Sequence, residues 1–314
     1  MRGWTTLLKF VAAGFCAALF TSCEGGDEEN SGLPKVVTST TMITDLAKVI
    51  GGENVEVVGL MGAGIDPHMY TVSQSALIDI KKADLIIYNG LHLEGKAESI
   101  FEDQKERGAK VITVAKVISS DKLIDPGEGE EHSDPHLWGD VSLWSECIKP
   151  VEDALAELDP DNAEAYRTRA EAFRAELKEL HDWAKNRIAD VPEDQRVLVT
   201  SHDAFNYFGR AYGLEVIGLQ GISTVGELGI AARVALTEQI KERGIKAIFV
   251  ESSVNSDAIR GVAEDAGVEI GGELFSDALG TPGEIEEVDG VSYDVGTYTG
   301  MIRHNVNTIV EALR

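Results

Sequence analysis

The 314-residue sequence is poor in cysteine and in basic residues, and both shortages restrict what the protein can be. Three cysteines, Cys16, Cys23 and Cys147, are too few for a scaffold held together by disulfides. The 28 lysines and arginines face 54 acidic residues, which gives a formal net charge of −26. A surface this acidic repels phosphate backbones, so nucleic acid is excluded as a partner, whereas cations are not.

Long apolar runs are also missing after the N-terminal segment, so no later part of the sequence is expected to span a membrane. The one pronounced run covers residues 10–20 and follows the basic residues Arg2 and Lys9. Eleven residues are too few for a permanent transmembrane helix. A short apolar run behind basic residues is typical of the core of a secretory signal.

The run ends in Leu19-Phe20-Thr21-Ser22-Cys23, which resembles a bacterial lipoprotein signal. In such signals the cysteine is acylated and becomes the new N-terminus. We therefore expect a signal peptide at residues 1–22, a lipid on Cys23, and a flexible acidic tether at residues 23–33. An ordinary cleaved signal with an incidental cysteine is the alternative. Either signal predicts export, and the lipid would hold the protein on the extracytoplasmic side of a membrane.

The rest of the chain alternates short β-branched strands with helices, a pattern typical of βαβ units on parallel sheets. We therefore predict an α/β fold with two lobes, at residues 34–158 and 192–314. The predicted strands cover residues 35–38, 55–60, 84–88 and 110–114 in the first lobe, and 197–199, 215–219, 246–250 and 268–270 in the second.

One long helix is predicted between the lobes, at residues 159–191. Its apolar residues recur every three or four positions and form one stripe: Tyr166, Ala170, Phe173, Leu177, Leu180, Ala184 and Ile188. About 30 helical residues at 1.5 Å each would extend roughly 45 Å, enough to run along both lobes. Such a rigid connection would limit the motion of one lobe against the other.

Three of the seven histidines lie where α/β lobes place ligand sites, close to the ends of predicted strands. His68 and His136 each end an Asp-Pro-His triplet, at residues 66–68 and 134–136, and His202 closely follows a strand. Proline fixes the backbone before each imidazole, and the aspartate could accept the second ring N–H. A surface histidine in a turn is the ordinary explanation of one triplet, but two triplets and His202 together favour a metal site.

A fourth ligand is harder to choose because acidic residues are abundant. Asp277 follows the last predicted strand of the second lobe, between glycines that allow close backbone approach, and this position distinguishes it from carboxylates on helix faces. Considered by itself, Asp277 could equally be an ordinary loop carboxylate. Cys147 sits at helical spacing in an apolar stretch, where a small core residue is expected.

Several motifs in combination resemble the zinc/manganese solute-binding lipoproteins of ABC transporters. Besides the two Asp-Pro-His triplets, they are Leu137-Trp138, His202-Asp203-Ala204-Phe205, Gln220-Gly221-Ile222-Ser223-Thr224, Phe249-Val250-Glu251-Ser252-Ser253 and residues 271–277. The resemblance covers the chain from about Pro34 to Arg314.

This resemblance implies two α/β lobes bridged by one long helix, with a single metal ion bound between them. The implied ligands are His68, His136, His202 and Asp277. The implied partners are a membrane permease and its ATPase, and the protein would be a monomer. Some members, chiefly manganese binders, have glutamate where His202 stands, so the ligand set resembles the zinc-leaning branch. The His-rich loop of typical zinc-uptake members is replaced by a short acidic segment with one histidine, His132.

The chemistry of this ligand set agrees with zinc without settling the metal. Zn²⁺ accepts imidazole nitrogen and carboxylate oxygen in a four-coordinate site, and Mn²⁺ stands below it in the affinity series. Both lobes contribute ligands, so binding should stabilise the closed arrangement. Affinity should fall as the pH drops through roughly 6 to 7, because protonated imidazole cannot bind metal.

Two other functions are compatible with parts of the sequence. A zinc metallohydrolase would need an open position on the metal, and Glu251 could then be proposed as its general base. Four available ligands argue against it, Glu251 is more readily a structural residue, and no nucleophile elbow or phosphate loop is present. We therefore expect a protein that is not an enzyme. A lipid-anchored surface adhesin is the second alternative.

Overall fold

The structure is a computed structural model that describes residues 32–125, 132–226 and 229–314. Residues Leu33–Arg314 form one compact unit, which is described below. The expected signal peptide, Cys23 and most of the tether lie outside the described residues. No helix in the described part of the chain is long and apolar enough to cross a membrane.

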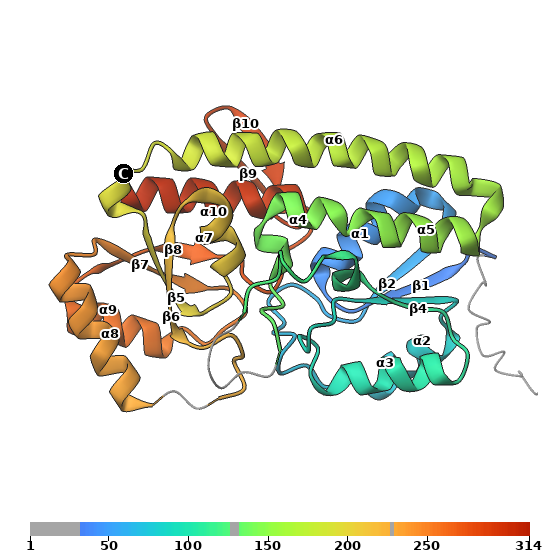
Figure 1. Cartoon of the computed structure of the whole chain (residues 1–314), viewed down its shortest axis with the longest axis horizontal. Helices are drawn as coiled ribbons and strands as arrows, with labels where there is room; N and C mark the ends of the chain where they lie inside the picture. The colour runs from blue at the N-terminus through green and yellow to red at the C-terminus, as the bar shows by residue number, and fades with distance from the viewer. Residues whose placement is uncertain (1–31, 126–131, 227–228) are drawn as a thin grey trace, which may run out of the picture. The chain divides into compact units, whose positions relative to one another are not determined.

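The first lobe is built on a four-stranded parallel sheet with the strand order β2-β1-β3-β4. Its strands are β1 (Lys35–Thr38), β2 (Glu56–Gly59), β3 (Leu85–Tyr88) and β4 (Val111–Thr113). Helices α1 (Thr41–Gly51) and α5 (Ile148–Leu158) cover one face of this sheet (Figure 1). Helices α2 (Gln74–Lys82) and α3 (Lys96–Glu106) cover the other.

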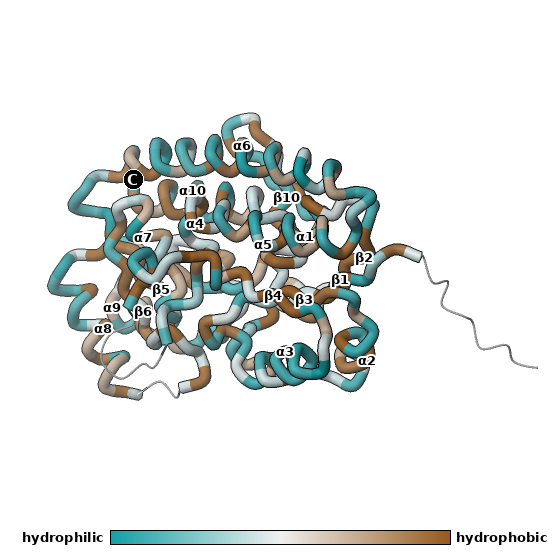
Figure 2. The backbone as a smooth tube through the Cα atoms, turned by 45° about the vertical axis from the view of Figure 1, so that its right-hand side comes forward, coloured by the Kyte–Doolittle hydropathy of each residue, from teal (hydrophilic) through white to brown (hydrophobic). Residues whose placement is uncertain are grey.

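Alternation along the buried strands explains this two-sided packing, because successive side chains point to opposite faces. Val36 of β1 packs into the core on the α1 and α5 side, whereas the neighbouring Val37 packs with α2 and α3. Strands buried on both faces are rich in apolar residues, and β3, with the sequence Leu-Ile-Ile-Tyr, is an example that is mainly brown in Figure 2. Ser73 caps the start of α2, because its hydroxyl accepts the N–H of Ala76.

The second lobe pairs β5 (Val197–His202) with β6 (Glu215–Gln220), and β7 (Ala247–Glu251) with β8 (Glu269–Leu274), all in parallel. Strand β5 also lies beside β7. Helices α8 (Ile230–Arg243) and α9 (Asp257–Ala266) cover one face of these strands. Helices α7 (Asn206–Tyr212) and α10 (Tyr298–Leu313) lie on the other (Figure 1).

The long connecting helix is present as α6 (Ala163–Ile188), preceded by a short 3₁₀ turn at Pro160–Asn162. Its 26 residues extend about 39 Å along α5 and α4 (Val141–Glu146) of the first lobe and α10 of the second. All seven residues of the predicted apolar stripe are buried. One hydrophobic core contains this stripe together with residues of both lobes, such as Leu155 and Ile302. The lobes therefore share a core along the helix.

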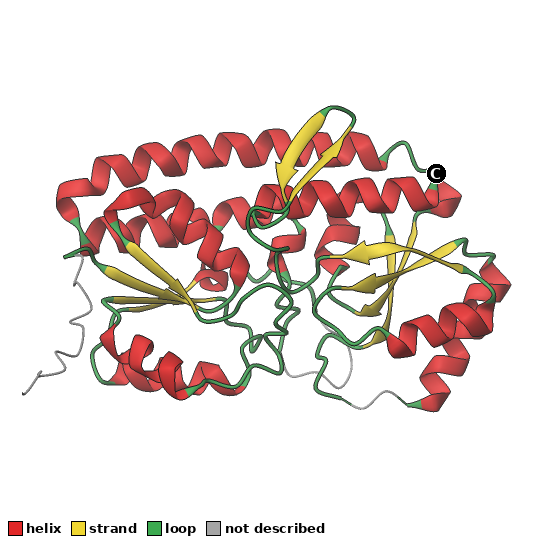
Figure 3. Cartoon of the chain, turned by 180° about the vertical axis from the view of Figure 1, so that it is seen from behind, coloured by secondary structure: helices red, strands yellow, loops and turns green. Residues whose placement is uncertain are grey.

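Two features differ from the predicted elements. Strands β5 and β8 run further than expected, so that His202 is the last residue of β5 rather than a loop residue behind it. An antiparallel hairpin of β9 (Ile285–Val288) and β10 (Val291–Asp294) was not predicted and packs against α6 and α10 (Figure 3). Its turn contains Asp289 and Gly290, both with positive φ, and Asp-Gly is a strong hairpin signal that was available in the sequence.

Candidate metal centre

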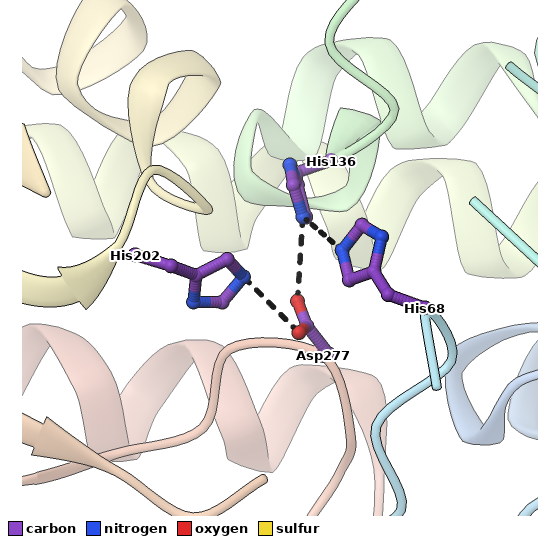
Figure 4. Close-up of side chains that lie close together, drawn as sticks. All are labelled: His68, His136, His202 and Asp277. Atoms are coloured by element: carbon purple, nitrogen blue, oxygen red, sulfur yellow. Dashed lines mark hydrogen bonds and ion pairs between the residues drawn. The ribbon is translucent and has the colours of Figure 1, made fainter. Parts of the chain in front are cut away.

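Four buried side chains converge where the loops of the two lobes meet (Figure 4). His68 lies in the loop after β2, and His136 lies just before the 3₁₀ turn Leu137–Gly139. His202 ends β5, and Asp277 lies in the loop after β8. Each of the four residues offers one ligand atom, and these atoms lie within 4.8 Å of one another. The structure thus brings together all four residues that the sequence predicted as ligands.

Three distances within the cluster are close to the edge length of a small tetrahedral site, and two of them end on different oxygens of Asp277. His68 Nε2 lies 3.3 Å from His136 Nε2, which lies 3.5 Å from Asp277 Oδ1. Asp277 Oδ2 lies 3.2 Å from His202 Nε2. Four ligands at about 2.0–2.1 Å from a tetrahedral zinc ion are about 3.3–3.4 Å apart.

Several of these ligand atoms are buried without a hydrogen bond. Among the described residues, His202 Nε2 and both carboxylate oxygens of Asp277 have no hydrogen-bond partner, although they are buried. Buried polar atoms are normally paired, so unpaired atoms that point at one another require an explanation. A metal ion at their centre would pair them all. The residues present therefore fit a divalent cation of zinc size.

His136 is held by the aspartate of its own triplet. Asp134 Oδ1 accepts the backbone N–H of His136 at 2.9 Å and its ring Nδ1–H at 2.8 Å. With Nδ1 engaged, Nε2 is the nitrogen that faces the site. This contact confirms the expectation that an aspartate orients the ring, an arrangement common around metal-bound histidines.

His202 is held by Glu251, the last residue of β7. Glu251 Oε1 accepts the backbone N–H of His202 at 3.0 Å, and Oε2 lies 2.6 Å from its Nδ1, an ion-pair distance. Both side chains are buried. Glu251 therefore holds His202 in place, in agreement with the structural role expected from the sequence.

His68 is held differently from the other two histidines. Asp66 Oδ1 accepts the backbone N–H of His68 at 2.8 Å. Its second oxygen, Oδ2, accepts the hydroxyl of Thr224 at 2.6 Å. The expected contact between this aspartate and the imidazole ring is thus replaced by a contact with the backbone. Thr224, from the other lobe, is a supporting residue that the sequence did not reveal.

The loop that carries Asp277 belongs to the second lobe but is fastened to the first. Trp138 Nε1 donates to the carbonyl of Ser276 at 2.7 Å, and Thr41 Oγ1 accepts the N–H of Leu279 at 2.8 Å. Trp138 therefore packs beside the site and anchors the Asp277 loop without being a ligand. Nothing in the sequence pattern linked Thr41 to residues so far along the chain.

Burial and charge give the ligands different protonation states in the metal-free protein. Burial lowers the pKa of His68 to about 3, although Asp277 opposes the shift. Burial would lower the pKa of His202 too, but Glu251 and Asp277 raise it well above 6.5. Burial would raise the pKa of Asp277, but the imidazoles of His202 and His136 hold that pKa well below its usual range. A metal ion would therefore meet an ionised Asp277 and displace a proton from His202.

The remaining described histidines lie outside the cluster. The side chain of His92 is exposed, and its ring centroid lies 4.6 Å from that of His132. His181 contacts Tyr212, and His304 pairs with Glu286. The cluster thus contains three of the seven histidines.

Two α/β lobes, one bridging helix and a buried His₃Asp cluster define a metal-binding protein of the solute-receptor class. The family described as the periplasmic component A of the zinc-uptake complex matches residues 36–312, and the chain belongs to this family. The predicted family resemblance is thereby confirmed. Members of this family are solute-binding transport proteins.

Similar proteins carry names that refer to different metals. The manganese-binding lipoprotein MntA of Bacillus subtilis is 43% identical over 288 residues, 89% of this chain and 90% of the relative. The zinc-binding protein TroA of Treponema pallidum is 42% identical over 301 residues, 94% of each chain. The iron-binding protein YfeA of Yersinia pestis is 31% identical over 278 residues, 88% of this chain and 85% of the relative.

The fold agrees with solved structures of the same kind. The periplasmic zinc-binding protein TroA from Treponema pallidum superposes with a TM-score of 0.83 and 41% identity, covering 90% of this chain and 99% of that one. The predicted architecture of two lobes and one long helix is therefore confirmed. Because the relatives are named for zinc, manganese and iron, family membership alone does not choose the metal.

Proposed function

We propose that this protein is the extracytoplasmic solute-binding subunit of an ABC transporter, and that it captures a divalent transition metal and delivers it to the membrane permease. The observation that carries the proposal is the buried cluster of His68, His136, His202 and Asp277, in which one ligand atom of each residue lies within 4.8 Å of the other three. The metal is the cargo of the protein. These four residues are its proposed ligands.

Zinc is the favoured cargo, with manganese as the alternative. Three imidazole nitrogens and one carboxylate oxygen in a compact site suit Zn²⁺, whereas Mn²⁺ favours more oxygen donors. No cysteine is among the four ligands, which disfavours soft ions such as Cu(I). Binding should close the two lobes on the ion, with small motions because they share a core along α6.

The same geometry argues against the metallohydrolase. Four protein ligands fill a tetrahedral shell, whereas catalytic zinc keeps a position for water. Glu251, the residue that could have acted as a base, is engaged with His202 at both carboxylate oxygens. We therefore propose a binding protein without catalytic activity. No feature of the described residues points to a surface for adhesion. The adhesin is therefore kept as the alternative that the measurement of metal content, given below, would favour if no metal were bound.

The cellular setting follows from the same proposal. Residues 1–22 would be removed as a signal peptide, and a lipid on Cys23 would hold the protein by the tether at residues 23–33. Two lobes at residues 34–158 and 192–314, joined by the connecting segment 159–191 that contains α6, would act as a monomer. The partners would be a membrane permease and its ATPase.

Metal content measured by mass spectrometry on the mature chain tests the proposal. Wild-type protein equilibrated with zinc should hold about one ion per chain, as four ligands in one cluster imply. His202→Ala should lose most of it, while His181→Ala, which removes an imidazole on α6 outside the cluster, should not. Competition between Zn²⁺ and Mn²⁺ on the stripped protein then names the preferred ion. No stoichiometric metal with either ion would overturn the proposal and favour the adhesin.

A further inference from the structure

The four ligands are buried, so an ion must pass through a part of the protein that can open. The two Asp-Pro-His triplets differ in what holds them to the second lobe. Asp66 Oδ2 accepts the hydroxyl of Thr224 at 2.6 Å. Asp134 Oδ2 accepts the amide of Asn206 at 3.1 Å. Each aspartate thereby joins a ligand-bearing loop of the first lobe to the second lobe.

The Asp134 side is built into the core. Asp134 is fully buried, and its backbone carbonyl also accepts the hydroxyl of Tyr207 at 2.9 Å. Tyr207 and the next residue, Phe208, belong to the large shared core. Moving His136 away from the metal would therefore disrupt the packing of α7. This side of the site is poorly suited to opening.

The Asp66 side is held by a surface segment. Thr224 is half-buried, and the residues around it from Gly221 to Gly226 are exposed or half-buried. Val225 beside it is 63% exposed. The loop that carries Asp66 and His68 is also near the surface, since Ile65 is 42% and Met69 59% exposed. Separating Thr224 from Asp66 would break one hydrogen bond and expose little apolar surface.

A cavity of about 370 Å³ lies at this hydrogen bond. Asp66 forms its wall on the first lobe, and Thr224, Gln220 and Ser253 belong to its wall on the second. Ser201 also lines it, and this residue directly precedes the ligand His202. The described residues that line the cavity thus include sequence neighbours of His68 and His202, although the four ligands themselves are not among them.

We propose that the metal enters and leaves through this cavity on the His68 side, and that the Thr224–Asp66 hydrogen bond is the latch that closes the route. This inference rests on the proposed function of the site. Asp66 carries both the latch and the bond to the His68 backbone, so release of Thr224 frees the loop with its ligand as one piece. Thr224 is therefore a positioning residue that acts on the metal through Asp66.

The test measures how fast zinc leaves the loaded protein when an excess of a chromophoric chelator is added in a stopped-flow instrument. Thr224→Val keeps the shape of the side chain and removes its hydroxyl. Because hydrogen bonds to charged groups are the stronger ones, release should become about tenfold faster or more. Thr224→Ser keeps the hydroxyl and should release zinc at close to the wild-type rate. Asp66→Asn should also release faster, because it weakens the acceptor.

Thr168→Val is the matched control, since it removes a hydroxyl from the exposed face of α6 and should change nothing. Thermal unfolding of each metal-free variant shows that it folds. Release from Thr224→Val at the wild-type rate would overturn the latch, and so would a Thr224→Ser variant as fast as Thr224→Val. A wild-type protein that holds no zinc would instead refute the proposed function.

Discussion

Replacing Glu251 with glutamine tests whether the cluster is organised from behind His202. Glu251 contacts the histidine at two points, the backbone N–H at 3.0 Å and Nδ1 at 2.6 Å. Glutamine keeps the size of the side chain and one acceptor oxygen but removes the charge. The imidazole then loses the carboxylate that holds its Nδ1–H and directs Nε2 to the metal.

The expected cost is a tenfold to hundredfold loss of zinc affinity, which corresponds to about 1.4 to 2.7 kcal/mol. The loss should depend on pH. Glu251 and Asp277 raise the pKa of His202 in the metal-free protein, so below that pKa a proton competes with zinc. Without the charge of Glu251 the His202 pKa falls, and competition begins at a lower pH. The difference between wild type and variant should therefore be largest at high pH and shrink as the pH falls.

Competition titrations against a fluorescent zinc chelator at about pH 6, 7 and 8, the range in which imidazoles titrate, measure both effects. Glu286→Gln is the matched control, because it removes a carboxylate 2.9 Å from His304 outside the site. That variant should keep the affinity and pH profile of the wild type. Equal zinc affinity at every pH for wild type and Glu251→Gln would refute the reasoning.

Three further predictions concern the metal-free fold. Burial raises the pKa of Glu94 from 4.5 to about 7, so between these pH values the folded protein keeps a proton that the unfolded chain releases. The free energy of unfolding, measured in urea, should therefore fall by up to about 3 kcal/mol as the pH rises through this window. Glu94→Gln should remove this fall. Leu177→Ala should cost about 2–5 kcal/mol of unfolding free energy because Leu177 is fully buried in α6, while zinc stoichiometry should stay unchanged; a loss below 1 kcal/mol would contradict the packing. Burial raises the pKa of the Cys147 thiol, so a thiol-specific reagent should label it only in denaturant, and fast labelling of the folded protein would contradict its position.

The elements that could be predicted are those with a strong period. The stripe of α6, from Tyr166 to Ile188, fixes both the helix and its buried face, because every member lies on one side at helical spacing. The strand β3 is a continuous run of buried residues, Leu-Ile-Ile-Tyr, and β1 has two consecutive buried valines; both strands were also predicted. The hairpin of β9 and β10 was missed because the first strand has two acidic residues, Glu286 and Glu287, at its centre. Only the Asp-Gly turn gave a signal for it.

Three members of the cluster could be predicted from the residues, because His68 and His136 end the paired Asp-Pro-His triplets and His202 lies near a strand end. For Asp277 the residues left the choice open, and only the family resemblance selected it. The residues that hold the loops of the cluster in place could not be predicted from the sequence. The bonds from Thr224 to Asp66 and from Asn206 to Asp134 join positions 158 and 72 residues apart, and they depend on how two lobes face each other. Threonine and asparagine in loops have many ordinary roles, so composition alone does not single these two out.

X-ray absorption at the zinc edge of the loaded protein tests the central claim most directly, because it reports the atoms bound to the ion. The proposal predicts four nitrogen or oxygen ligands at about 2.0–2.1 Å with the multiple scattering of three imidazoles, falling to two imidazoles in His202→Ala. A six-coordinate oxygen shell, or an unchanged imidazole count in that variant, would contradict a metal held by His68, His136, His202 and Asp277.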